Sequence, residues 1–162
     1  MSDDAPPAEA GADADEPGVF HEIEVGDRTV TGGRTITEAD VVNFAGVSGD
    51  FNHLHTDEDR MGESVFGERI AHGMFVLSAA TGLVWQHRSV EVRNSVVAFY
   101  GIDALRFRKP VYIGDTIHVE TEVLETDPRP QGPGNGTVRY ALEIKNQRDE
   151  VVISFEMISL PE

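Results

Sequence analysis

The chain has 162 residues, of which 40 % are hydrophobic, and it contains no cysteine. This length favours one domain with one core, and the lack of cysteine excludes disulfide scaffolds and thiolate catalysis. The formal net charge of −16 disfavours nucleic acid and anionic membranes as partners. No apolar run reaches membrane-spanning length and no signal peptide is recognisable, so we expect a cytoplasmic protein.

The basic residues are unevenly chosen. Lys109 and Lys145 are the only lysines, against eleven arginines and 29 acidic residues. An acidic, lysine-poor surface suits concentrated salt, where screening shortens charge repulsion to ~3 Å at 1 M. We interpret the chain as halophilic. The alternative is an acidic tail on a moderately acidic domain, because residues 1–17 carry six acids and no base.

The first third of the chain predicts a tail, a strand and a helix. Residues 1–17 are rich in Ala, Pro, Asp and Glu and predict a disordered tail, which leaves residues 18–162 as a single domain. Residues 28–36 alternate weakly and predict a strand with a bulge or turn at Gly32 and Gly33. Thr37 and Asp40 have the spacing of a capping box, which predicts a helix that ends near Gly49.

The rest of the chain predicts a buried helix followed by strands. Residues 50–57 are expected to form a loop and residues 57–64 a short polar helix. Residues 73–86 are apolar on nearly every side, which is typical of a buried helix. Four runs with period-two patterning predict antiparallel strands: residues 94–107, 115–125, 137–146 and 151–160. One apolar helix against an antiparallel sheet is an α+β layout.

Two short motifs combine acidic, amide and imidazole groups. They are Ser48-Gly49-Asp50-Phe51-Asn52-His53-Leu54-His55 and His72-Gly73-Met74. Together they resemble the MaoC-like (R)-specific enoyl-CoA hydratases and dehydratases, in which S-x-D-x-N-P-(L/I)-H is followed by H-G-M. The order of elements is similar from about Arg28 to Leu160. His53 stands where that family usually has proline, a change that affects loop stiffness.

The resemblance implies a hot-dog fold, in which an antiparallel sheet wraps one long buried helix. It also implies reversible syn addition of water to a trans-2-enoyl-CoA, giving an (R)-3-hydroxyacyl-CoA. Coenzyme A is then part of the substrate, and no separate cofactor is expected. Asp50 and His55 match the catalytic pair, and a carboxylate and an imidazole that share one water can act as base and acid. The backbone N–H of Gly73, at a helix N-terminus, matches the donor to the thioester oxygen.

Three further residues match supporting positions. We expect Asn52 to order the loop or the water and His72 to orient the loop. Thr81 falls where the family often places a small hydroxyl residue that orients the aspartate. The alternative for Asn52 is ordinary turn formation, and for Thr81 a hydroxyl bonded to its own helix backbone.

A metal site is the chemical rival at the first motif. Asp50, His53, His55 and Asp57 are all possible ligands. The segment does not fit an EF-hand, because His55 occupies the sixth position, where glycine is needed. Close spacing alone does not set tetrahedral geometry, and we predict no metal site.

The remaining expectations concern partners. Arg106, Arg108 and Lys109 form the only basic cluster of the acidic domain and are candidates for the CoA phosphates, with surface salt bridges as the alternative. The resemblance implies a homodimer with sheets paired edge to edge, which would cover an exposed strand. It also implies an acyl tunnel beside the 73–86 helix. The rival functions are an acyl-CoA thioesterase on the same fold and a non-catalytic acyl-CoA-binding subunit.

Overall fold

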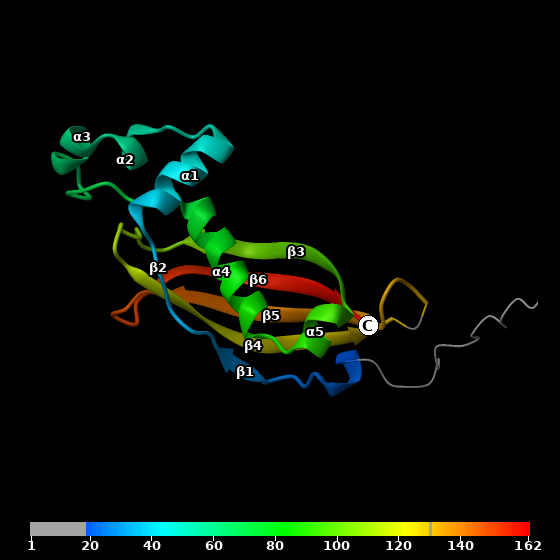
Figure 1. Cartoon of the computed structure of the whole chain (residues 1–162). Helices are drawn as coiled ribbons and strands as arrows, with labels where there is room; N and C mark the ends of the chain where they lie inside the picture. Colours follow the sequence, from blue (N-terminus) through cyan, green and yellow to red (C-terminus); the bar gives the residue numbers. More distant parts are fainter. Residues whose placement is uncertain (1–18, 130) are drawn as a thin grey trace, which may run out of the picture.

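The structure is a computed structural model that describes residues 19–129 and 131–162. The predicted tail at residues 1–17 lies outside the described residues. One antiparallel sheet forms the body of the molecule, α4 lies across one of its faces, and α1, α2 and α3 gather beyond one end (Figure 1). This arrangement confirms the predicted α+β layout.

The sheet has the strand order β1-β4-β5-β6-β3, and the short β2 also pairs with β4. All pairs are antiparallel. The strands are β1 (Arg28–Val30), β2 (Arg34–Thr35), β3 (Val96–Phe107), β4 (Thr116–Pro128), β5 (Gly136–Lys145) and β6 (Val151–Pro161). All four predicted C-terminal strands are confirmed. The predicted 28–36 strand is divided at the two glycines, as their presence indicated.

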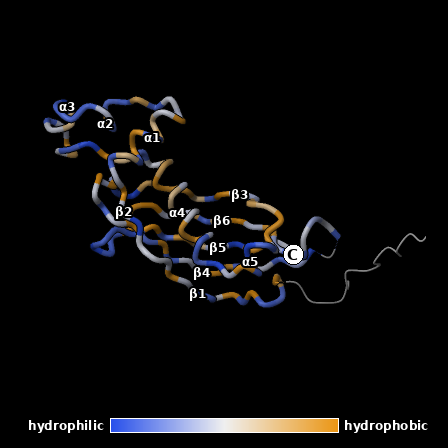
Figure 2. The backbone as a smooth tube through the Cα atoms, viewed as in Figure 1, coloured by the Kyte–Doolittle hydropathy of each residue, from blue (hydrophilic) through white to orange (hydrophobic). Residues whose placement is uncertain are grey.

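The core lies between α4 (Gly73–His87) and the sheet. Ala79 and Ala80 are buried on the helix, and such small side chains let the strands approach closely. The strands contribute larger apolar side chains, including Val119, Leu142 and Ile144. Each of these stabilises the fold by roughly 1.5–3 kcal/mol through its burial. The hydropathy of the backbone follows this division, with hydrophobic residues along much of α4 and hydrophilic ones around α3 (Figure 2).

The capping box predicted at the first helix is present. The Thr37 side chain accepts from the Asp40 N–H, and the Asp40 side chain accepts from the Thr37 N–H, at the start of α1 (Glu38–Ser48). Gly49 ends the helix in the left-handed region with φ 75°, and its N–H bonds to the Ala45 carbonyl. The short polar helix predicted next is α3 (Glu58–Gly62).

Three sequence predictions need correction. Residues 50–57 are not all loop, because α2 (His53–Thr56) forms where the Asn52 side chain accepts from the Leu54 N–H. The 73–86 helix, expected to be buried because it is apolar on nearly every side, is only partly so, since Met74 is 53 % and Trp85 43 % exposed on α4. The helices η1 (Val19–Glu22) and α5 (Val90–Ser95) were not predicted.

Within residues 19–129 and 131–162, no helix has the length and apolar character needed to cross a membrane.

Candidate active site

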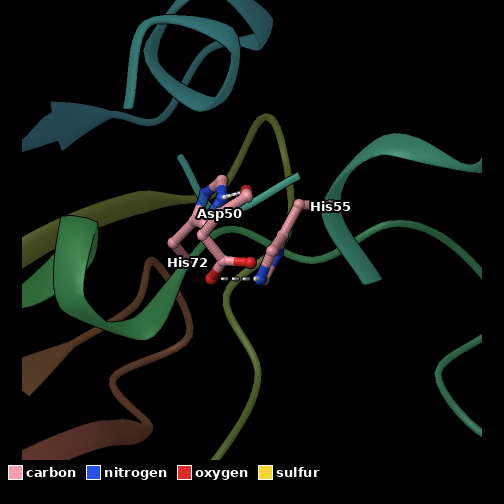
Figure 3. A group of neighbouring side chains, drawn as sticks. All are labelled: Asp50, His55 and His72. Carbon is pink, nitrogen blue, oxygen red and sulfur yellow. Dashed lines mark hydrogen bonds and ion pairs between the residues drawn. The ribbon is translucent and has the colours of Figure 1, made fainter. Parts of the chain in front are cut away.

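Asp50, His55 and His72 come together from three segments (Figure 3). Asp50 follows α1, His55 lies in α2, and His72 is the N-cap residue of α4. Asp50 Oδ2 lies 4.0 Å from His55 Nε2. The rings of His55 and His72 stack with centroids 3.7 Å apart. The structure therefore places the two residues of the predicted pair side by side, with His72 against both.

The hydrogen bonding of His55 defines its tautomer. Its Nδ1 lies 2.7 Å from the Ile70 carbonyl oxygen. A carbonyl only accepts, so Nδ1 carries the proton and the lone pair of Nε2 faces Asp50. Burial lowers the pKa of His55 below its ordinary value of 6.5, opposed in part by the bond to Ile70. The imidazole is therefore neutral near pH 7, with a lone pair that can accept a proton.

The gap between the pair is suited to a water. A separation of 4.0 Å between Asp50 Oδ2 and His55 Nε2 is too long for a direct hydrogen bond. A water at ~2.8 Å from each atom can bridge them. The pair can thus hold one water between a carboxylate and an imidazole.

Local hydrogen bonds hold the carboxylate of Asp50. Its Oδ1 accepts from the Asn52 N–H at 3.2 Å, and its own N–H donates to Ser48 Oγ at 3.1 Å. Asn52 in turn accepts from the Leu54 N–H through its side chain, which starts α2. Because Oδ1 is engaged, Oδ2 is left to face His55. Asn52 thus uses its side-chain oxygen to cap the start of α2, as the turn-forming alternative describes, and a role in ordering the water stays a prediction.

His53 is the first residue of α2. Proline is favoured at this helix position because its missing N–H would have no partner inside the helix. His53 therefore stands in for the proline of the resembled motif at a position where the helix can form with either residue. The side chain of Asn52 caps the start of the helix.

Of the four residues weighed as a metal site, only Asp50 and His55 lie together. The Asp57 side chain accepts from the Arg60 N–H as the cap of α3, and His53 is not part of the cluster. Asp50, His55 and His72 offer ligand atoms within 4.8 Å of one another. However, two imidazoles on one tetrahedral metal diverge, which places their centroids ~5 Å apart. The stacked rings, with centroids 3.7 Å apart, do not fit such an ion.

Gly73 opens α4 beside the cluster. The first N–H groups of a helix have no partner inside it, and His72 provides no side-chain cap. Gly73 borders a pocket of about 480 Å³ that His55, Phe107, Arg108 and Lys109 also line. A Cβ on Gly73 would lie 2.6 Å from Cε1 of Phe107. The first obstacle to a side chain here is thus the Phe107 ring, a neighbour that the sequence did not indicate.

The predicted basic cluster is divided. Arg108 and Lys109 line the pocket, whereas Arg106 does not. Lys109 Nζ pairs with Glu150 at 2.6 Å, and Arg108 Nε donates to Ser154 Oγ at 3.0 Å. The salt-bridge alternative thus describes part of the role of Lys109, while Arg108 has no acidic partner among the described residues.

Thr81 lies away from the cluster within one chain. Thr81 is more than two helical turns beyond His72 along α4, and its hydroxyl donates to the Ser78 carbonyl at 2.8 Å. It borders a second pocket of about 480 Å³, lined also by Trp85 and Phe99. The predicted contact with Asp50 is not made among the described residues, and the orienting role stays a prediction.

Arg69 is a site residue that the sequence analysis missed. Its guanidinium donates to Glu38 in α1 at 2.7 and 2.8 Å and lies 3.1 Å from Glu58 in α3. It also donates to the His55 carbonyl in α2 at 3.4 Å. The hydrogen bond from Arg69 lowers the pKa of Glu38. One arginine thus ties together the three helices around Asp50 and His55, and no sequence pattern joins residues so far apart.

An antiparallel sheet over one long helix, with these polar groups at its N-terminus, defines a hot-dog protein. The MaoC like domain model matches residues 22–145, and the chain belongs to this family of MaoC-like dehydratases.

Individual relatives agree with this assignment. Protein MaoC of Klebsiella aerogenes is 51 % identical over 100 residues, which are 62 % of this chain and 29 % of that protein. An (R)-specific enoyl-CoA hydratase of Rhodospirillum rubrum is 39 % identical over 98 residues, covering 60 % of this chain and 64 % of the hydratase. A solved monoamine oxidase regulatory protein from Archaeoglobus fulgidus is 41 % identical with a TM-score of 0.79, covering 88 % and 92 % of the two chains.

Proposed function

We propose that the protein is an (R)-specific enoyl-CoA hydratase that also catalyses the reverse dehydration. The observation that carries this proposal is the position of Asp50 Oδ2 4.0 Å from Nε2 of His55, beside the pocket at Gly73. The Rhodospirillum hydratase supports the same activity for this chain.

The residues fit a balanced hydration step. Asp50 and His55 hold one water, whose oxygen attacks C3 of the enoyl thioester. One water proton passes to this pair, and the pair returns a proton to C2, so that H and OH add while the site is restored. Because one water held at this single pair supplies both the hydroxyl and the proton, the proposed addition is syn. The N–H of Gly73 stabilises the thioester oxygen as negative charge develops.

The pockets support a path for the acyl-CoA. Arg108 and Lys109 border the pocket at Gly73, where they would meet CoA phosphates. Met74 borders the same pocket, and Ser78, one turn further along α4, borders the second pocket. We therefore place the acyl chain along this face of the helix.

A homodimer is part of the proposal. β3 lies at the edge of the sheet and contains no fully buried residue. Phe99, Tyr100 and Ile102 are exposed on it. Pairing with a second copy would cover this apolar edge. Sedimentation equilibrium should give twice the chain mass of 17.7 kDa, and a monomer at assay concentrations would contradict the dimer.

Turnover of crotonyl-CoA tests the activity. We expect loss of the conjugated enoyl thioester, formation of (R)-3-hydroxybutyryl-CoA on chiral analysis and no free thiol. Because we interpret the acidic chain as halophilic, the assay includes a series of KCl concentrations. Release of CoA thiol would instead identify a thioesterase, and binding without turnover a non-catalytic subunit; either outcome would overturn the proposal.

A further inference from the structure

His72 has more contacts with the catalytic pair than a helix cap requires. The side chain is 2 % exposed. Its Nε2 lies 2.9 Å from the carbonyl oxygen of Asp50 and its ring stacks on His55. The ring of Phe44, from α1, packs against it with centroids 5.0 Å apart. The imidazole is thus held between α1 and α2 at the first residue before α4.

The hydrogen bonding of His72 argues against a packing role alone. The Asp50 carbonyl only accepts, so Nε2 of His72 carries a proton and donates to it. Nδ1 is buried and has no hydrogen-bond partner among the described residues. A buried, unpaired polar atom is destabilising. A phenyl ring would fill the same space without this penalty, so what the imidazole adds over a packing ring is the bond that Nε2 makes.

His72 is also not placed to react. Ala71 and Gly73 on either side of it line the pocket, but His72 does not. The N–H of its Nε2 is engaged by the Asp50 carbonyl. Any effect of His72 on chemistry must therefore pass through the groups that it touches.

We infer that His72 is a positioning residue that sets the distance between the Asp50 carboxylate and His55 Nε2, an inference that rests on the proposed hydration. Its N–H anchors the backbone of Asp50, and its ring fixes the plane of His55. The next residue along the chain supplies the Gly73 N–H. One side chain thereby aligns the two proton-handling groups with the oxyanion donor.

Two substitutions separate the hydrogen bond of His72 to the Asp50 carbonyl from the stacking of its ring on His55. His72→Phe keeps a stacked ring but removes the donor to Asp50. His72→Gln keeps an N–H donor of similar reach but removes the ring. We expect His72→Phe to lower kcat by on the order of 10²-fold, as a misplacement of about 1 Å can. KM and Tm should stay near the parent values, and His72→Gln should retain more of kcat than His72→Phe.

The matched control is His53→Gln, which changes a histidine of α2 that is not part of the cluster and should leave kcat unchanged. A second control places His72→Phe in the Asp50→Asn background. Because His72 acts through Asp50, it should have little further effect there. A merely structural role would not produce this loss of additivity.

The outcomes are distinct. Normal kcat in folded His72→Phe overturns the inference, as does a fall in Tm with activity per folded molecule preserved. If His72→Phe does not fold, His72→Asn replaces it, since its amide is one methylene too short to reach the Asp50 carbonyl. Absence of hydratase turnover in the parent protein would defeat the proposed function instead, before any His72 variant is compared.

Discussion

The three-helix segment (residues 38–62, α1 to α3) lies beyond one end of the sheet (Figure 1). The two regions are stabilised by different kinds of interaction. In the three-helix segment, directional bonds dominate: the capping box at Thr37, the Asn52 cap and the ion pairs of Arg69. Its helices bury only Val41, Ala45, His55 and Met61 among the described residues. The sheet and α4 contribute most of the apolar core.

The interactions that position the polar atoms of the site are therefore different from those that contribute most of the free energy of unfolding. Hydrogen bonds and ion pairs fix the positions of individual atoms, but each adds only about 1 kcal/mol of net stability. Apolar burial adds more free energy per residue without fixing a particular polar atom. Changes in the three-helix segment should therefore alter turnover at nearly constant Tm, and changes in the sheet should do the reverse.

The largest expected effect belongs to Asp50 and His55, the proposed catalytic pair. Asp50→Asn and His55→Gln each preserve a polar side chain while removing a group that handles the proton. Each should lower kcat by about 10²–10⁴-fold, and the double variant should lose little more than the worse single one. Tm and affinity for a saturated acyl-CoA should change little. Near-normal turnover in folded Asp50→Asn would refute the mechanism.

Gly73 is the next test. We expect Gly73→Val to lower kcat by on the order of 10²-fold or more, by analogy with loss of one oxyanion donor. The close approach of the Phe107 ring offers a control, because Gly73→Val with Phe107→Ala relieves the clash of the new side chain with that ring. If the double variant folds and remains slow, the side chain obstructs the thioester. Recovery of turnover would show that Gly73 serves packing only.

The sheet should show the opposite response. Leu142 in β5 is 1 % exposed, and Leu142→Ala should lower the free energy of unfolding by about 2–5 kcal/mol. Because the residue is not in the cluster, kcat per folded molecule should be unchanged. Chemical denaturation and a turnover assay corrected for folded fraction measure the two quantities. A large fall in kcat would show that the two regions are coupled.

The smallest expected effect concerns pH. Burial lowers the pKa of His55, so the acid limb of kcat/KM should have its midpoint below 6.5. The folded state binds fewer protons than the unfolded state here. The stabilising contribution is therefore present above pH 6.5 and is lost as the pH falls towards the folded pKa. A pH–rate profile whose acid limb lies above 6.5 would contradict the assignment of His55.

Sequence patterns were sufficient where the signal was local. The capping box at Thr37, the glycine end of α1 and the alternation of the last four strands each depend on nearby residues, and the structure has all of them. The resemblance of the two motifs also anticipated that Asp50 and His55 lie together.

The patterns failed where distant residues decide. One miss was local instead: α5 was not predicted, although its start depends on the Ser89 hydroxyl accepting from the Val92 N–H only three positions on. Arg69 meets Glu38 across 31 positions of sequence, and the Phe107 ring covers Gly73 only after the sheet has formed. The apolar pattern of α4 predicts a buried helix, but it does not tell which of its residues the sheet covers, and Met74 and Trp85 stay exposed.

The pairing of β1 with β4 has a consequence for the order in which the molecule assembles. The hydroxyls of Thr29 and Thr121 meet at 2.7 Å, although 92 positions separate them. In contrast, β5 follows β4 closely, and a turn at residues 147–150 joins β5 to β6. Contacts between distant positions must first overcome the entropy of closing a long loop. We therefore expect the β4-β5-β6 meander to form early in folding and β1 to dock late, closing the sheet after the helix-bearing half of the chain is in place.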